Sequence, residues 1–315
     1  MLKSTTFFTC LFVLNLSFAQ QDKQLTHYMF ERMSFNPAAT GFAGYSGTFI
    51  YRNQWDRVQD APNTSVLNFE AKLPKNNVSI GMSFTNDAIG FQRNNTLTFN
   101  GAYHFPTRVG VLSGGVGIGL INVGFSPNWI PPVTLMDPSL PLATSGTAFD
   151  LNIGLFWSSS KRPYYIALST THLAPQTLAT INFSVVRHYY VLTGYTYRLN
   201  TSRKIDLKPS FILKTDGATA VFDLNITGDI WMTNYSYLWA GMTYRLQDAI
   251  AFNVGYAFSP SQKTTMNMMK IGYSFDVMTN PLNTYGRGTH ELMLNFSIFP
   301  PPCRVTRTSC PFILQ

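Results

Sequence analysis

Apolar and polar side chains alternate with a period of two along most of the chain. In residues 97–105 the apolar positions are Leu97, Phe99, Tyr103 and Phe105, and the residues between them are polar or small. A period of two is typical of a β-strand with one apolar and one polar face. The pattern therefore predicts an all-β chain whose strands separate two different environments.

Continued along the sequence, this alternation predicts about 14 antiparallel strands of roughly 9–12 residues, which matches the length that a tilted strand needs to cross a membrane. An even number of strands fits a bacterial barrel whose two chain ends lie in the periplasm. The proline-containing break at residues 127–147 is the longest, and we expect it to be an external loop. The expected strands are residues 48–57, 64–73, 78–85, 97–105, 112–120, 149–157, 164–168, 185–199, 205–213, 221–230, 238–246, 250–258, 269–277 and 292–298. The polar face of 112–120 is rich in glycine, which indicates either a close approach of backbone or free room in the lumen.

The composition favours a membrane barrel over a soluble protein. Only 12% of the residues are charged, against about 25% in typical soluble proteins, while 15% are aromatic and the mean hydropathy is near zero. Few charges with neutral hydropathy fit strands that face lipid on one side and water on the other. A secreted soluble β-sandwich is the alternative. Tyrosines and tryptophans near the strand ends predict interface girdles, with core packing as the other interpretation: Tyr51, Trp55, Tyr103, Trp157, Tyr164, Tyr195 and Tyr197.

Residues 1–19 have the pattern of a secretory signal peptide. Lys3 gives a positive start, residues 7–16 are mostly apolar, and a small-x-small site ends at Ala19. Cys10 lies inside the apolar stretch, so it is not expected to carry a lipid. No later stretch is apolar for long enough to cross a membrane as a helix, and without helices only a closed barrel satisfies the backbone in lipid. We therefore expect a signal peptide at 1–19, an N-terminal periplasmic or plug segment at 20–46, a transmembrane barrel at 47–299 and a periplasmic tail at 300–315, in the bacterial outer membrane.

The N-terminal segment carries a second kind of pattern. Leu25, Tyr28, Met29 and Met33 are spaced like one face of a short helix, which Asn36-Pro37 ends. Two interpretations remain open: a segment that plugs the barrel or contacts a partner, and a strap packed against the barrel mouth.

The formal net charge is +8, or +7 without Lys3, since 22 basic residues then face 15 acidic ones. The basic residues are scattered, so nucleic acid is not an expected partner; a cationic lumen or rim, or contact with anionic lipid headgroups, fits better. After three prolines, the tail carries Arg304 and Arg307, which suggest a docking peptide, with a disordered end as the alternative. Cys303 and Cys310 are candidates for a small disulfide ring.

The sequence lacks the motifs of an enzyme. It has no HExxH pair among its five histidines and no nucleophile elbow, P-loop or CxxC motif, so we expect no catalytic residue, metal or cofactor. A phospholipase could use His104 or His290, but no partner serine is marked. We interpret the strand carboxylates as lumenal groups paired with Arg or Lys: Asp87, Asp150, Asp223, Asp276 and Glu291.

Several local motifs resemble one known family, the PorP/SprF outer-membrane proteins of the type IX secretion system of Bacteroidota. The motifs are Gln21-Asp22, His27-Tyr28-Met29-Phe30 and Asn36-Pro37-Ala38 near the N-terminus; Tyr51, Arg52, Gln54, Trp55, Ala61, Pro62 and Thr64 in the first hairpin; Asn86, Asp87, Ile89 and Gly90; and Gly288-Thr289-His290-Glu291. The first three groups cover roughly the first third of the mature chain. The two-cysteine tail departs from the family pattern.

The resemblance implies a non-enzymatic barrel that assists protein export, in some relatives in connection with gliding motility and adhesins. It implies periplasmic lipoproteins or ring proteins of the secretion system, and C-terminal domains of cargo, as partners. Arg52, Gln54 and Trp55 would set the first hairpin, and Asn86 and Asp87 the turn before Gly90, with direct partner contact as the alternative. A porin-like transporter of small or hydrophobic solutes is the competing function.

Overall fold

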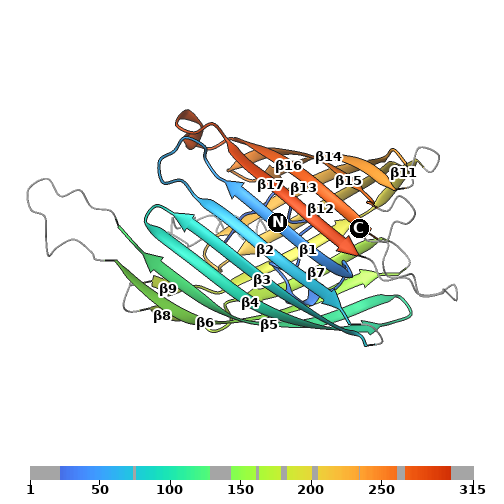
Figure 1. Cartoon of the computed structure of the whole chain (residues 1–315), viewed down its shortest axis with the longest axis horizontal. Helices are drawn as coiled ribbons and strands as arrows, with labels where there is room; N and C mark the ends of the chain where they lie inside the picture. Colours follow the sequence, from blue (N-terminus) through green and yellow to red (C-terminus); the bar gives the residue numbers. More distant parts are fainter. Residues whose placement is uncertain are drawn as a thin grey trace, which may run out of the picture.

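The computed structural model describes residues 22–73, 76–127, 143–160, 163–178, 183–200, 205–233, 235–260 and 267–298. Nearly all of them lie in strands of one large antiparallel sheet that curves into a barrel (Figure 1). The strands are β1 (Tyr45–Asn53), β2 (Asn63–Lys72), β3 (Val78–Ile89), β4 (Gln92–Pro106), β5 (Gly110–Phe125), β6 (Thr144–Ser159), β7 (Tyr164–Thr171), β8 (Gln176–Leu178), β9 (Phe183–Val185), β10 (His188–Tyr195), β11 (Tyr197–Asn200), β12 (Ile205–Thr215), β13 (Ala220–Trp231), β14 (Ser236–Arg245), β15 (Ala249–Phe258), β16 (Asn267–Met278) and β17 (Thr289–Ile298). Two short 3-10 helices are η1 (Pro37–Ala39) and η2 (Pro281–Thr284).

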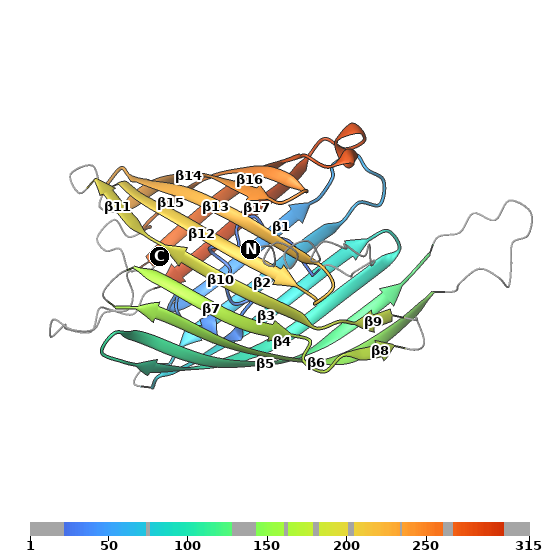
Figure 2. The same ribbon diagram turned by 180° about the vertical axis from the view of Figure 1, so that it is seen from behind.

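The sheet closes on itself. From β1 to β7 and from β12 to β17, consecutive strands pair; β7 pairs with β10, β10 pairs with β12, and β1 pairs with β17. Figure 2 shows β7, β10 and β12 side by side on the far wall. Because β10 and β11 both pair with β12, they form one interrupted strand, and the 15 segments of the sheet make a 14-strand barrel. The predicted fold and strand number are confirmed.

Most observed strands extend beyond the predicted ranges, and two boundaries differ clearly from the prediction in the opposite direction. β1 ends at Asn53 rather than at residue 57, because Trp55 and Arg57 have φ angles of +54° and +71°, which no extended strand contains. The strand expected at 185–199 begins only at His188, since Val185 belongs to β9 in a separate hairpin with β8. The turn after β1 and the β8–β9 hairpin therefore end strands that the alternation of apolar and polar residues predicts to continue.

The barrel has two different ends. At one of them, Tyr45 at the start of β1 pairs with Ile298 at the end of β17, and most connections are short; we call it the short-turn end. The opposite end lies to the left in Figure 1 and carries the β5–β6 connection, the β8–β9 hairpin and the η2 connection; we call it the long-loop end.

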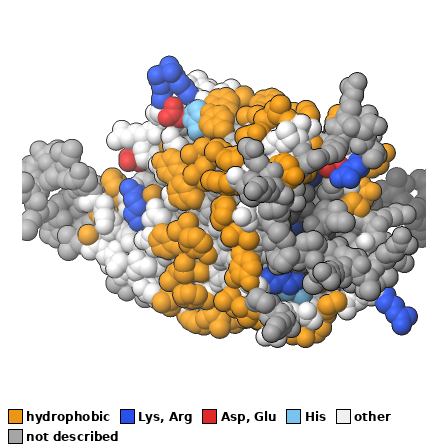
Figure 3. All heavy atoms as spheres, turned by 45° about the vertical axis from the view of Figure 1, so that its right-hand side comes forward, with side chains coloured by type: hydrophobic (Ala, Val, Ile, Leu, Met, Phe, Trp, Pro, Cys, Tyr) orange, Lys and Arg blue, Asp and Glu red, His pale blue; other side chains and the backbone are white. Residues whose placement is uncertain are grey.

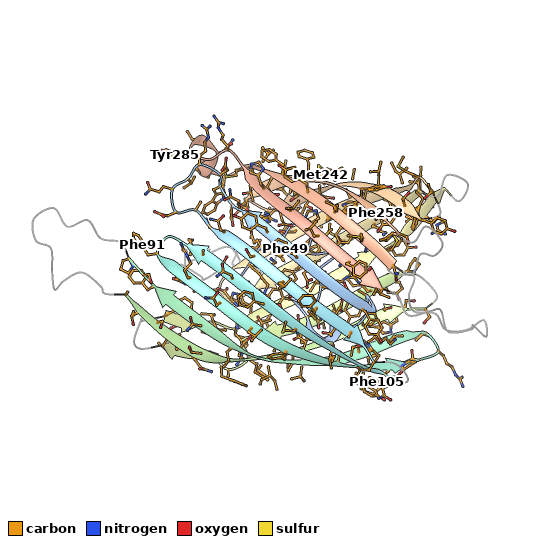
Figure 4. All side chains as sticks on the ribbon, viewed as in Figure 1. Phe49, Phe91, Phe105, Met242, Phe258 and Tyr285 are labelled. Carbon is orange, nitrogen blue, oxygen red and sulfur yellow. The ribbon has the colours of Figure 1, made fainter. Side chains whose placement is uncertain are left out.

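The outer face of the barrel is apolar. A broad band of hydrophobic side chains covers the strands in Figure 3, and the side chains labelled in Figure 4, such as Phe49 and Phe105, point outward. This is the surface that membrane barrels present to lipid. Exposed apolar residues include Phe69, Ile80, Phe99, Ile118, Leu120, Leu155, Leu168, Ile226, Phe252 and Leu294.

The predicted girdle residues divide into two groups. Tyr51, Tyr103, Tyr195 and Tyr197 are exposed on the outer face. Trp157 and Tyr164 pack edge to face with ring centroids 5.1 Å apart near the short-turn end. Trp55 is the exception, because it follows the end of β1 and lines a cavity inside the long-loop end. Its interpretation as a girdle residue is wrong.

The interior of the barrel holds a hydrophobic core that includes residues of the N-terminal region. Side chains of residues 22–44, which precede β1, pack against inward-facing residues of the wall, and Leu25, Tyr28 and Phe35 are completely buried. Among the described residues, no helix is long and apolar enough to span a membrane. The barrel lumen is therefore occupied by the chain's own N-terminal region, which we call the lumenal segment.

Candidate functional site

The lumenal segment runs through the barrel from one end to the other. The Asp22 carboxylate accepts a hydrogen bond from the Tyr190 hydroxyl near the long-loop end. The Gly41 backbone N–H donates to the Glu70 carboxylate at 2.6 Å near the short-turn end. Asp22, the first described residue, and Ile298, the last, thus lie at opposite ends of the barrel. The placement of both chain termini on one side of the membrane stays a prediction.

The segment is a series of turns rather than the predicted short helix. Backbone hydrogen bonds join residues three apart, as from Phe30 to His27 and from Glu31 to Tyr28, and η1 is its one helical turn. Leu25 and Tyr28, which the pattern placed on one apolar face, are both buried. The spacing thus identified buried residues correctly but their backbone conformation wrongly, because consecutive turns can place such side chains on one side as a helix does.

Two residues of the lumenal segment bind a buried carboxylate of the wall. Glu291 accepts hydrogen bonds from the backbone N–H groups of Thr26 and His27, each at 2.8 Å, and contacts His27 Nδ1 at 2.7 Å. Arg52 donates to Glu291 at 3.1 Å and to Asp276 at 2.7 Å. Arg52 and Glu291 face each other across the β1–β17 pairing, so the strand register brings this pair together.

A second arginine extends these contacts. Arg245 donates to Asp276 at 3.1 Å and to both oxygens of Asp223 at 3.2 Å, and it lies 3.4 Å from Asp248. We call this set the ionic cluster: Arg52, Arg245, Asp223, Asp248, Asp276, Glu291 and His27. Its two arginines are almost fully buried. A buried charge that loses its partner is strongly destabilising, so the cluster ties the lumenal segment to the wall.

The expected pairing of strand carboxylates is confirmed for part of the set. Asp223, Asp276 and Glu291 pair with arginine. Asp150 instead contacts His172 at 2.8 Å, and Asp87 accepts a hydrogen bond from Thr64 at 2.5 Å. For these two the prediction of an Arg or Lys partner is wrong, because their strands present no lumenal arginine nearby and use smaller polar side chains.

Asn36 and Pro37 fix the middle of the lumenal segment. The Asn36 amide donates to the carbonyl oxygens of Leu155 and Leu168 at 3.0 and 3.1 Å, so it bonds to β6 and β7 together. Its side-chain oxygen accepts from the Ala38 N–H at 2.8 Å and caps η1, with Pro37 in the first turn.

Glycines of the wall make this close approach possible. A Cβ atom at Gly154 would lie 2.1 Å from the Asn36 side-chain oxygen, and one at Gly115 would lie 2.3 Å from the Ala38 nitrogen. The interpretation of the glycine-rich face of 112–120 as a place of close backbone approach is confirmed at Gly115. At these two glycines the lumenal segment thus lies directly against the backbone of the wall.

The remaining motif residues lie apart from one another. Gln54 and Trp55 lie in the β1–β2 connection, where the Trp55 N–H donates to the Thr289 hydroxyl at 3.1 Å. Asp87 faces the lumen beside them, whereas Asn86 points outward and donates to Asn95 at 2.7 Å. The structure therefore does not gather the motif residues into one site. Arg304, Arg307, Cys303 and Cys310 lie outside the described residues.

The long-loop end opens into a cavity of about 750 Å³, which we call the vestibule. The lumenal segment forms its floor, and the wall strands and the β8–β9 hairpin surround it. His172, which follows β7 with φ +54°, lies at its edge. Burial opposes protonation of His172, but the hydrogen bond and charge of Asp150 outweigh it and raise the pKa of His172. In the described part of the chain, no group of His, Cys, Asp or Glu side chains is placed to hold a metal ion.

Sequence reasoning did not identify Thr26 or Arg245 as partners of the ionic cluster. The one available signal for Arg245 was its place in the alternation, because Met242 and Tyr244 point outward and Arg245 therefore points inward. Which carboxylates it meets depends on pairings between strands that are far apart in the sequence.

Comparisons with known proteins agree with this architecture. The model of a family described as "Type IX secretion system membrane protein PorP/SprF" matches residues 17–296. The fold is similar to that of the CymD monoaromatic hydrocarbon channel, with 9% identity, coverage of 86% of this chain and 93% of that one, and a TM-score of 0.52. A FadL homologue of Pseudomonas aeruginosa matches with 12% identity, 83% and 91% coverage and a TM-score of 0.46. No curated protein sequence matches the chain.

Proposed function

This chain belongs to the PorP/SprF family of type IX secretion system membrane proteins, and we propose that it assists the export or surface attachment of cargo proteins. In this role it acts without catalysis, as an outer-membrane barrel that holds partners. The observation that carries the proposal is the family match, which covers the lumenal segment and almost all of the strands. Gliding-motility adhesins are one class of cargo that the family suggests.

The filled lumen supports a secretion component over a porin-like transporter. The ionic cluster, the Asn36 contacts and the buried apolar residues hold the lumenal segment along the barrel. A solute would have to displace these contacts to pass. Breaking a buried ion pair costs about 3–5 kcal/mol, so the occupied state is the stable one.

We also propose an orientation for the barrel. Outer-membrane barrels keep short turns in the periplasm and longer loops outside. By this rule the long-loop end and its vestibule face the cell exterior, and the short-turn end, where β17 ends, faces the periplasm. Periplasmic lipoproteins or ring proteins of the system would meet the short-turn end, and C-terminal domains of cargo would meet the exterior.

The culture-supernatant and cell-surface proteomes of the host with this gene deleted test the proposal. We expect a defined set of secreted or surface proteins to be lost from both fractions and restored when the wild-type gene is returned. The second readout is uptake of small and hydrophobic solutes by purified protein in liposomes, where we expect no flux above that of empty liposomes.

The two readouts separate the candidate functions. An unchanged set of exported proteins together with solute flux through the reconstituted barrel would overturn the export role and favour the transporter. An arginine variant that weakens the ionic cluster provides a control for the second readout, because it should increase flux only if the lumenal segment normally closes the barrel.

A further inference from the structure

The vestibule has a wall of hydrogen-bonding groups without protein partners. Ser83 and Thr85 of β3 and Thr98 and Asn100 of β4 line it with side chains that are 6–7% exposed. Among the described residues, none of these four has a hydrogen-bond partner for its side chain. The three hydroxyl groups can each donate and accept a hydrogen bond, and the Asn100 amide has an NH₂ donor and an oxygen acceptor. Ser83 and Thr98 are direct cross-strand neighbours, so the groups form one continuous patch.

The carboxylates around the vestibule, in contrast, already have partners, and the Lys23 ammonium lies 5.9 Å from the centre of the Phe35 ring. Asp150 contacts His172 and accepts from Asn152 at 2.9 Å. Asp87 accepts from Thr64, and Asp248 accepts from Asn280 at 3.0 Å. The free hydrogen-bonding capacity of the wall is therefore neutral. A neutral ligand with many donors and acceptors matches it better than an ion does.

Apolar side chains also line the vestibule, next to further polar residues. The lumenal segment contributes Met33, Phe35 and Pro37, and the wall and the hairpin contribute Ile121, Phe183 and Val185. Polar and apolar groups that line one cavity of about 750 Å³ match a ligand that has hydroxyl groups on its edges and C–H groups on its faces. Sugar rings have this chemistry.

Other ligand classes fit less well. A purely hydrocarbon ligand would leave the hydroxyl and amide groups of β3 and β4 without partners in a dehydrated site, which costs free energy. A peptide usually binds a sheet by adding a strand to a free edge; the closed sheet of the barrel offers none, and strands β8 and β9 of the hairpin beside the vestibule are only three residues long. We infer that the vestibule is a binding site for a neutral saccharide chain, held by Ser83, Thr85, Thr98 and Asn100.

The test uses the full-length barrel purified in an amine-oxide detergent, which has no sugar headgroup to compete. The labelled protein is applied to a printed array of neutral and acidic glycans, and the dissociation constant of each bound glycan is measured by calorimetry. We expect binding to a subset of neutral glycans. Thr85→Val and Thr98→Val, which remove one hydroxyl with little change in shape, should each raise the dissociation constant about three- to tenfold, the effect of one hydrogen bond.

Ser113→Ala is the matched control for Ser83→Ala. Ser113 is also a buried, inward-facing serine whose hydroxyl has no partner in the described part of the chain, but it lies outside the vestibule. Ser83→Ala should weaken binding and Ser113→Ala should not, and heat-modifiable gel mobility shows that each variant is folded. The inference is overturned if no neutral glycan binds, if only acidic glycans bind, or if the three wall variants bind as the wild type does. None of these outcomes depends on the export role.

Discussion

At the scale of single residues, the buried arginines decide how the lumenal segment is held. Arg52 belongs to the first hairpin motif and also contacts the lumenal segment. Its guanidinium donates hydrogen bonds to Glu291, to Asp276 and to the Thr26 hydroxyl. Removing it would leave two carboxylates buried beside each other with less compensation. This loss costs far more than the loss of an exposed charge.

We therefore expect Arg52→Ala to destabilise the barrel by about 3–5 kcal/mol. The measurement is the temperature at which the folded, fast-migrating gel band converts to the unfolded one. Arg93→Ala is the control, because Arg93 is exposed and, within the described ranges, bonds only to the backbone carbonyls of Gly90 and Gln92, so its effect should stay within about 0.5 kcal/mol. Equal conversion temperatures for the two variants would show that the ionic cluster does not hold the structure together.

Residue-level chemistry was predictable from the sequence only in part. The alternation placed Leu97 and Phe99 on one face without knowledge of any other strand, because successive side chains of a strand point to opposite faces. It could not show that Arg52 meets Glu291, because that contact depends on the register of two strands at opposite ends of the chain. Trp55 was misplaced because the left-handed conformation that ends β1 has no counterpart in an apolar pattern.

At the scale of elements, the fit between η1 and strands β5 and β6 sets the position of the lumenal segment. Gly115 and Gly154 leave space that Asn36, Pro37 and Ala38 fill. The strands here were predictable, and so was a close approach at the glycine-rich face. The turns of the lumenal segment were not, because buried side chains spaced three or four residues apart fit both a helix and successive turns.

A larger side chain at this contact should displace the lumenal segment. We expect Gly115→Val to raise ion conductance in planar bilayers severalfold over the wild type, because its side chain would overlap the backbone of Ala38. Gly114→Val is the matched control: its side chain would point away from the lumen and meet nothing within 4 Å. If both variants conduct as the wild type does, the segment does not close the barrel at this point.

At the scale of the whole molecule, the difference between the two ends gives the barrel its direction. Long connections gather at one end together with the vestibule, and the start of β1 meets the end of β17 at the other. The closed 14-strand barrel was predictable, because strand number and length follow from local patterns. The vestibule was not, since its wall, floor and hairpin come together only when the chain is folded around residues 22–44.

The proposed direction can be tested by labelling intact cells with a membrane-impermeant maleimide, after Cys303 and Cys310 are changed to Ser. Ala218→Cys places a thiol in the β12–β13 turn at the long-loop end, and Arg108→Cys places one in the β4–β5 turn at the short-turn end. We expect labelling of the first in intact cells, and of the second only after the outer membrane is permeabilised. The reverse result would invert the orientation.

The ionic cluster also constrains the order in which the molecule can fold. Thr26 and His27 bind Glu291, which lies 265 and 264 residues further along the chain. The complete set of contacts, in which Arg52 also bonds to Glu291, requires β17 to pair with β1, because that pairing makes Arg52 and Glu291 neighbours. Contacts between such distant positions are slow to form. The contacts that join the lumenal segment to both Arg52 and Glu291 are therefore completed only in a closed barrel.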